Sequence, residues 1–192
     1  MEKEIDLEEV KAAVETLKAG GIILYPTDTV WGIGCDATNE EAVARVFEIK
    51  KRSDSKSLIT LVADTDMLGR YVKVIPDVAI NLIEVNDRPM TIVYPDAAGL
   101  APNVVAEDGS AGIRIPMNDF CVEMIRRFRK PIVSTSANVS GEPAPAFYED
   151  IPLEIIDAVD WVADPYLEDG ATGEPSQVIR VGVHGEIRII RE

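Results

Sequence analysis

The sequence predicts an α/β or α+β domain built on a mixed β-sheet. Short apolar runs alternate along the chain with segments whose apolar residues recur at helical spacing, which is typical of strands interleaved with helices. The last two apolar runs flank a turn that contains His184 and Gly185, so they predict a terminal antiparallel hairpin and therefore a mixed sheet. The 192 residues suffice for one well-buried core, and no linker divides them, so we expect a single domain over residues 1–192.

Helices are predicted where apolar periodicity follows a capping pattern. Asp6 and Glu9 form the first such pattern, and Gly20-Gly21 ends the helix that follows. Thr38 and Glu41 indicate a second capping box, before a helix that ends near Lys50. Further helices are expected at 66–71, 76–85, from the cap Asn118 to about 128, and at 155–162.

Strands are predicted where apolar runs are short and bounded by turn residues. They are expected at 22–25, 58–62, 90–94, 112–115, 131–134, 177–181 and 186–190. The stretch 142–152 is rich in proline and acidic residues, so we expect it to form a surface loop.

Composition indicates an ordered protein of the reducing cytoplasm. Hydrophobic residues make up 46% and charged residues 28%, so wholesale disorder is excluded, and no apolar run is long enough for a membrane span. The first residues are charged and acidic, unlike a secretory signal. Cys35 and Cys121 lie too far apart to form a metal-type pair, and Cys35 is expected to be a packing residue.

The charge pattern favours a small anion over a nucleic acid as ligand. The net charge of −15 repels a phosphodiester backbone. A local basic cluster interrupts it, formed by Lys50, Lys51, Arg52 and Lys56. Such a cluster concentrates small anions, although cations at a helix C-terminus also complement the helix dipole, and the sequence leaves both explanations open.

Three polar segments are candidates for chemistry. Residues 25–34 place hydroxyls, a carboxylate and two glycines at the exit of a strand; residues 50–56 carry the basic cluster; residues 134–141 follow a buried strand with four hydroxyls and an amide. Ligands settle at the carboxyl ends of strands in open sheets, and cations stabilise charge on phosphate oxygens. Each segment also has an ordinary structural explanation as a turn or a solvated helix end.

Arg114 stands out because it lies inside an apolar strand. A guanidinium there needs an anionic partner, either a protein carboxylate or the carboxylate of a ligand. His184 is the only histidine and falls in the predicted hairpin turn, and there is no Gly-x-Ser-x-Gly or Walker motif. A triad hydrolase or a P-loop enzyme is therefore not indicated.

Taken together, the motifs resemble the YrdC/TsaC family of threonylcarbamoyl-AMP synthases, over about residues 7–191. The resemblance rests on four motifs: Tyr25-Pro-Thr-Asp-Thr-Val-Trp-Gly-Ile-Gly34, Lys50-x-Arg52, Gly112-Ile-Arg-Ile-Pro116 and Ser136-x-Asn138. It implies a YrdC/RibB-like fold, a twisted open mixed sheet with surrounding helices and a concave, positively lined cavity. The sequence departs from the family at Trp31, Ser53, Leu61, Ala144 and Gln177, where Tyr, Pro, His, Ser and Thr are usual.

The resemblance implies an L-threonylcarbamoyladenylate synthase, which makes threonylcarbamoyl-AMP and pyrophosphate from L-threonine, bicarbonate and ATP with Mg²⁺. Other proteins then transfer the threonylcarbamoyl group to the adenosine next to the anticodon of tRNA. Direct nucleic-acid binding is expected to be weak or absent, and no membrane is involved.

The resemblance also assigns roles by position. Catalytic roles fall to Lys50 and Arg52. ATP binding is assigned to Arg52, Lys56, Ser110, Ser136, Asn138 and Arg191. Threonine binding is assigned to Thr29, Arg114, Ser134 and Ser176, and no metal ligand is assigned.

Three alternatives stay open at the level of sequence. A paralogue with altered activity would share the fold, but such relatives tend to lose the Lys-x-Arg and Ser-x-Asn pairs that are intact here. An RNA-binding, translation-associated module is disfavoured by the charge of −15. A sugar-phosphate lyase on the same fold would need clustered acidic metal ligands and a histidine at the site, and the only histidine, His184, lies in the predicted hairpin turn.

Overall fold

The structure is a computed structural model that describes residues 5–52 and 58–192. The helices are α1 (Leu7–Lys18), α2 (Glu40–Ile49), α3 (Thr65–Tyr71), α4 (Asp77–Val85), α5 (Asp119–Phe128) and α6 (Leu153–Ala158), with 3-10 turns η1 (Tyr148–Asp150) and η2 (Pro165–Glu168). The strands are β1 (Ile23–Tyr25), β2 (Gly32–Gly34), β3 (Ile59–Leu61), β4 (Met90–Tyr94), β5 (Ala111–Arg114), β6 (Ile132–Ser136), β7 (Trp161–Val162), β8 (Gln177–Val181) and β9 (Ile187–Arg191).

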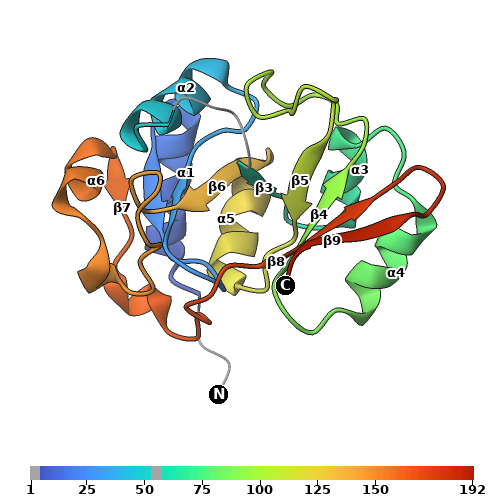
Figure 1. Cartoon of the computed structure of the whole chain (residues 1–192). Coiled ribbons are helices and arrows are strands. Elements are labelled where there is room, and N and C mark those ends of the chain that lie inside the picture. The colour runs from blue at the N-terminus through green and yellow to red at the C-terminus, as the bar shows by residue number, and fades with distance from the viewer. Residues whose placement is uncertain (1–4, 53–57) are drawn as a thin grey trace.

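All described strands join one mixed sheet in the order β7-β1-β2-β6-β3-β5-β4-β8-β9. The pairs β1–β7, β3–β5 and β4–β8 are parallel, and the other neighbours are antiparallel. β8 and β9 form the terminal hairpin, which extends to one side in Figure 1. The mixed sheet and the hairpin predicted from sequence are thus confirmed.

Two amphipathic helices, α1 and α5, contact each other and bury their apolar faces (Figure 1). These faces consist of Val10, Ala13, Val14 and Leu17 from α1 and Phe120, Cys121, Met124, Ile125 and Phe128 from α5. Burial of each large apolar side chain stabilises the fold by about 1.5–3 kcal/mol. Cys35 and Cys121 are both buried free thiols, and burial raises the pKa of each, which confirms the packing role expected for Cys35.

Strand pairing brings the polar segments of the sequence together. β2 pairs with β6 with Gly32 opposite Ser136, so the loop before β2 and the loop after β6 lie side by side. β6 in turn pairs with β3, and β3 with β5, where Leu61 lies opposite Arg114. This order of strands places Arg114 within 3.4 Å of Thr29 in the loop before β2, although the two residues are 85 apart in sequence.

Gly34 is required by this close strand approach. A Cβ atom built there would lie 2.6 Å from the carbonyl oxygen of Val133 and 2.7 Å from the ring of Tyr25. Neither contact leaves room for a methyl group, so the second glycine of the Tyr25–Gly34 motif has a packing reason to be glycine.

The local predictions were wrong at three places. The cap of α2 is Asn39, whose Oδ1 accepts the amide of Ala42, because the carboxylate of Asp36 binds both the amide and the hydroxyl of Thr38. The helix expected at 155–162 ends at Ala158, and residues 161–162 instead form β7 beside β1. Residues 32–34 form the strand β2, which the sequence did not predict. The surface loop expected at 142–152 is confirmed and contains the 3-10 turn η1.

None of the helices within residues 5–52 and 58–192 has the length and apolar character needed to cross a membrane.

Candidate functional site

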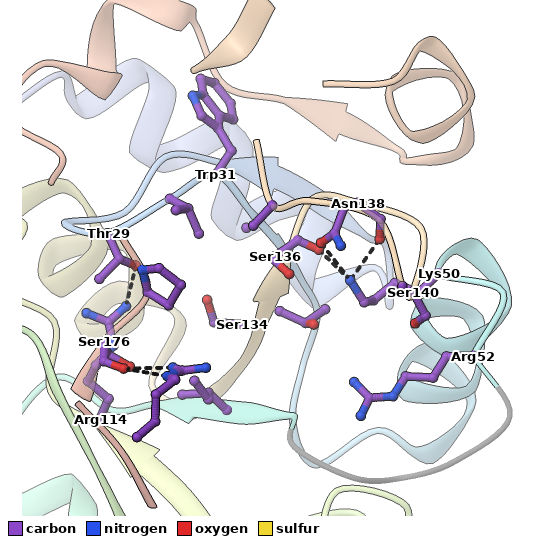
Figure 2. A pocket seen from close by; sticks show the side chains of 18 of the residues that line it. Thr29, Trp31, Lys50, Arg52, Arg114, Ser134, Ser136, Asn138, Ser140 and Ser176 are labelled. Carbon is purple, nitrogen blue, oxygen red and sulfur yellow. Dashed lines mark hydrogen bonds between the residues drawn. The ribbon is translucent and has the colours of Figure 1, made fainter. Parts of the chain in front are cut away.

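A cavity of about 510 Å³ lies where the β1–β2 loop, the end of α2, the loop after β6 and the ends of β8 and β9 meet. Its lining residues are mainly cationic or small and polar: Thr29, Val30, Trp31, Gly32, Lys50, Lys51, Arg52, Ile59, Arg114, Ser134, Thr135, Ser136, Asn138, Ser140, Gly141, Ala144, Pro175, Ser176 and Arg191. Figure 2 shows Thr29, Arg114 and Ser176 toward one end and Lys50 and Arg52 toward the other, with Ser134 and Ser136 between them.

The cavity has a positive lining inside an acidic protein. Five of its lining residues carry cationic groups (Lys50, Lys51, Arg52, Arg114 and Arg191), and no aspartate or glutamate is among the described lining residues. The whole chain has a net charge of −15. Such a concave cluster of cations focuses the local field and concentrates small anions.

Lys50, the C-cap of α2, is almost fully buried and fastens the loop after β6. Its ammonium donates to the carbonyl oxygens of Ser136 at 2.6 Å and Asn138 at 2.8 Å, and to Asn138 Oδ1 at 3.3 Å (Figure 2). The amide of Ser140 donates back to the carbonyl of Lys50 at 2.9 Å. Burial, and then the neighbouring Arg52 guanidinium, lower the pKa of Lys50 to about 8, so the group is still mainly protonated at pH 7.

Asn138 completes this loop. Its side-chain nitrogen donates to the carbonyl oxygens of Glu142 at 2.7 Å and Val139 at 3.1 Å, while its oxygen accepts from Lys50. The polar atoms of Asn138 are therefore engaged in shaping the loop that presents Ser136 and Ser140 to the cavity. The Lys-x-Arg and Ser-x-Asn motifs are joined physically by these contacts.

At the other end, Arg114 is held by a protein carboxylate. Its Nη1 pairs with Oδ1 of Asp28 at 2.5 Å, and its Nη2 lies 3.4 Å from the hydroxyl of Thr29. Nε of Arg114 is buried and has no hydrogen-bond partner in the described part of the protein. The sequence left a protein carboxylate and a ligand carboxylate open as the partner of Arg114, and the structure shows the protein carboxylate of Asp28. One N–H group of Arg114 is left without an acceptor among the described residues.

The hydroxyls of Thr29 and Ser176, at the same end of the cavity as Arg114, make hydrogen bonds with other hydroxyls. Thr27 Oγ1 lies 2.8 Å from Thr29 Oγ1 and also accepts the amide of Thr29 at 3.0 Å. The hydroxyl of Ser176 lies 2.8 Å from that of Thr91, and the carbonyl of Ser176 accepts two bonds from Arg191, at 2.7 and 3.0 Å. The rim of the cavity next to β8 is thus tied to the end of β9.

All but two of the site residues assigned by resemblance line this one cavity. Ser110 instead lines a neighbouring hollow of about 1020 Å³, which shares Ile59 and Arg191 with the first. Its hydroxyl binds Asp108, and this bond together with Arg180 holds the pKa of Asp108 well below its usual value. Lys56 falls outside the described residues. Arg52 and Asn138 line the same cavity, as the sequence required.

The sequence did not predict the contacts of Asp28 and Trp31. Asp28 was noted only as a carboxylate within a motif, yet it is the partner of Arg114. Trp31, a departure from the family pattern, donates from Nε1 to Glu168 at 2.6 Å, and its ring meets that of Tyr148 with centroids 5.3 Å apart. Leu61, another departure, is fully buried in β3 and is not part of the cavity lining.

The described residues offer no protein ligand set for a metal. They contain no group of three or more His, Cys, Asp or Glu side chains placed to hold an ion, and the described lining of the cavity has no carboxylate.

The fold and the site define a class of protein: an α/β domain with an open mixed sheet and a cavity lined by cationic and small polar residues. The Sua5/YciO/YrdC family model, described as "Telomere recombination", matches residues 15–192. The chain therefore belongs to this family, which confirms the resemblance found in its motifs.

Curated relatives agree with this assignment. The chain is 33% identical over 179 residues to a threonylcarbamoyl-AMP synthase of Stenotrophomonas maltophilia, an alignment that covers 92% of this chain and 94% of the relative. It is 32% identical over 176 residues to a protein of the same name from Xanthomonas euvesicatoria, with 90% and 93% covered.

Solved structures share the fold. Sua5 of P. abyssi in complex with L-threonine superposes with a TM-score of 0.83 at 26% identity, over 93% of this chain and 52% of that one. A variant of the same Sua5 gives a TM-score of 0.85 at 26% identity, over 98% and 57%. This chain thus spans little more than half of those proteins. MTH1692 from Methanobacterium thermoautotrophicum gives a TM-score of 0.71 at 33% identity, over 100% and 89%.

Proposed function

We propose that this chain is an L-threonylcarbamoyladenylate synthase, which uses L-threonine, bicarbonate and ATP to make threonylcarbamoyl-AMP and pyrophosphate. The observation that carries the proposal is the convergence, in one cavity, of a buried arginine suited to a carboxylate and a cluster of cations suited to phosphates. The described residues that line this cavity include no carboxylate. The names of the curated relatives and the threonine complex of P. abyssi Sua5 support the same reaction.

In this proposal the threonine carboxylate pairs with Arg114. The unpartnered Nε and the weakly engaged Nη2 of its guanidinium form one edge, and a planar fork of two N–H groups matches a carboxylate. The hydroxyls of Thr29, Ser134 and Ser176 lie around the same end and supply hydrogen-bonding partners for the amino acid.

The triphosphate occupies the other end. Arg52 lines this end of the cavity, and Lys50 contributes the charge of its ammonium. The end of β6 and the loop after it present Ser136 and Ser140 to the same space. Lys56 is proposed to join them on the strength of the family pattern. Arg191 borders both hollows and Ser110 lines the second, so the nucleoside part of ATP would extend from one hollow into the other.

The chemistry needs no protein nucleophile. The amine of threonine adds to bicarbonate and releases water to give a carbamate. A carbamate oxygen then attacks the α-phosphorus of ATP, and the bond to the β-phosphate oxygen breaks to release pyrophosphate. The protein contributes positioning of the two substrates and cations where negative charge develops on the phosphate oxygens. Arg52 and Lys50 are proposed for the second task.

Mg²⁺ is proposed to arrive with ATP as part of the substrate. Magnesium commonly keeps several waters and binds through substrate phosphates, which fits a cavity whose described lining lacks carboxylates. The product would pass to separate transfer proteins that act on tRNA. A filter-binding assay with tRNA at physiological salt tests the expectation of weak direct binding, and tight, salt-sensitive binding would favour the RNA-binding alternative.

The proposal is tested by pyrophosphate release measured with each common amino acid, with and without bicarbonate. We expect release that depends on both threonine and bicarbonate. Arg52→Ala should abolish it, since the guanidinium faces the phosphates in this account. Arg45→Ala is the matched control, because Arg45 lies on helix α2, just before the segment that carries Arg52, pairs with Asp160 at 3.0 Å and does not line the cavity. Release indifferent to threonine, or full activity in Arg52→Ala, would reject the assignment.

A further inference from the structure

Asp28 lies directly behind the proposed threonine-binding arginine. Its Oδ1 accepts from Arg114 Nη1, and its Oδ2 accepts the backbone amide of Met117 at 3.1 Å. The side chains of Asp28 and Arg114 are 9% and 3% exposed, so solvent does little to screen this ion pair. Both carboxylate oxygens are thus engaged by fixed partners.

Asp28 is itself fixed by the backbone around it. Its carbonyl accepts the amide of Thr172 at 3.0 Å, and the carbonyl of the next residue, Thr29, accepts the amide of Gly173 at 2.9 Å. These bonds tie the β1–β2 loop to the segment that leads to Ser176 on the cavity rim. The carboxylate therefore has a rigid frame from which to orient a neighbouring side chain.

The contacts of Arg114 divide its guanidinium into two sides. Within residues 5–52 and 58–192, Nη1 pairs with Asp28, Nη2 has only a 3.4 Å contact with the hydroxyl of Thr29, and Nε has no hydrogen-bond partner. Asp28 is not among the described residues that line the cavity, so it reaches a ligand only through Arg114. A carboxylate at this position holds the guanidinium plane still while leaving its Nε and Nη2 side available.

From this geometry we propose that Asp28 is a positioning residue, which sets the affinity for threonine by orienting Arg114 before the substrate binds. The proposal rests on the proposed function, since it takes threonine as the ligand of Arg114. Preorganisation of this kind raises affinity because the side chain does not have to be ordered when the ligand arrives. A purely structural ion pair would instead affect stability and leave the two substrate affinities in their original ratio.

The test compares the KM values for the two substrates in Asp28→Asn, which keeps the size of the side chain and removes its charge. Loss of a charge-assisted hydrogen bond should raise the KM for threonine by about tenfold or more. The KM for ATP should change by less than about twofold, since the phosphates lie at the other end of the cavity. Direct titration of threonine into the enzyme with ATP absent should show the same loss.

Asp36→Asn is the matched control. Asp36 is also a buried aspartate, 8% exposed in its side chain, and it pairs with Lys130 at 2.9 Å outside the cavity. This variant removes the same charge from a similar environment, so we expect it to lower thermal stability and leave both KM values at those of the wild type.

Asp28→Glu keeps the test decisive if the asparagine variant does not fold, because it retains the charge of the buried pair. The longer side chain displaces the guanidinium, so the KM for threonine should rise by several-fold, about threefold or more. If the folded Asp28 variants have the KM for threonine of the wild type, the proposed role of Asp28 is wrong. Threonine-dependent turnover by the wild type would still support the proposed function. Turnover by the wild type that ignores threonine would overturn both.

Discussion

Replacement of Lys50 by methionine is the sharpest test of how this site is built. The substitution keeps an unbranched side chain of similar length and removes the ammonium. That group makes hydrogen bonds of 2.6, 2.8 and 3.3 Å to the loop that contains Ser136 and Asn138. Three acceptors on the wall of the cavity then lose their donor at once.

The expected magnitude follows from these contacts. Hydrogen bonds to a charged group contribute about 1.5–3 kcal/mol each, so loss of the two shorter bonds costs about 3–6 kcal/mol. Removal of the buried charge offsets part of this loss in the free energy of unfolding, because the ammonium no longer has to be desolvated. A net loss of about 2 kcal/mol lowers the Tm of a protein of this size by about 4–8 °C. The Kd for ATP should rise by about tenfold or more, since a charge is lost and the loop is released.

Thermal unfolding and calorimetric titration with ATP measure the two effects. Lys51→Met is the control for stability, because Lys51 is exposed and pairs with Glu154 at 2.7 Å on the surface. Exposed pairs contribute about 0–1 kcal/mol, so this variant should unfold within about 3 °C of the wild type. If Lys50→Met matched the Lys51 variant in stability and the wild type in ATP affinity, the role of Lys50 as the anchor of the loop would be refuted.

Two further predictions address the strand approach and the effect of pH. Gly34→Ala should lower the free energy of unfolding by about 1–3 kcal/mol, because the added methyl group would collide with the carbonyl oxygen of Val133. The control is Gly69→Ala in helix α3, where no atom lies within 4 Å of the added methyl group, and it should raise the free energy of unfolding by about 0.5–1 kcal/mol. Equal denaturant midpoints for the two variants would contradict this prediction. The pKa of Lys50 is lowered to about 8, so its charge is present below that pH and lost above it, and the Kd for ATP should rise by about threefold or more between pH 7 and pH 9. A Kd for ATP that stays constant over this range would be evidence against a charged Lys50 near the phosphates.

The same shift has an opposite consequence for stability. Between pH 8 and the ordinary Lys value of 10.5, the unfolded chain binds more protons at Lys50 than the folded chain does. The contribution of this group to the free energy of unfolding therefore increases with pH over that interval. Deprotonation of Lys50 therefore does not destabilise the fold above pH 8. A loss of ATP affinity in this range would reflect the lost charge and not unfolding of the protein.

The sequence predicted most of the elements because periodicity and capping residues are local signals. The strand 90–94 and the cap Asn118 were placed correctly for this reason. The strand β2 was missed because its three residues, Gly32-Ile-Gly34, are too few to show periodicity, and it forms by pairing with β1 and β6. The helix expected through 162 failed where pairing with β1 overrides local preference.

The composition of the site was predictable, but its internal contacts were not. The motif residues lie in one cavity, as the resemblance implied, with Ser110 in the adjoining hollow. The ammonium of Lys50 donates to the loop after β6, and Asp28 is the partner of Arg114. Each of these contacts joins residues that are 86 apart in sequence. No local pattern encodes such pairings, because they arise only when the sheet is assembled.

We propose that threonine and ATP bind in one cavity and that the carbamate formed from threonine attacks the α-phosphorus of ATP there. The most direct test of this proposal is mass spectrometry of the products made from ¹³C-bicarbonate, threonine and ATP. The account predicts threonylcarbamoyl-AMP that carries one ¹³C atom and appears in step with pyrophosphate. Pyrophosphate released without a labelled adenylate would contradict it.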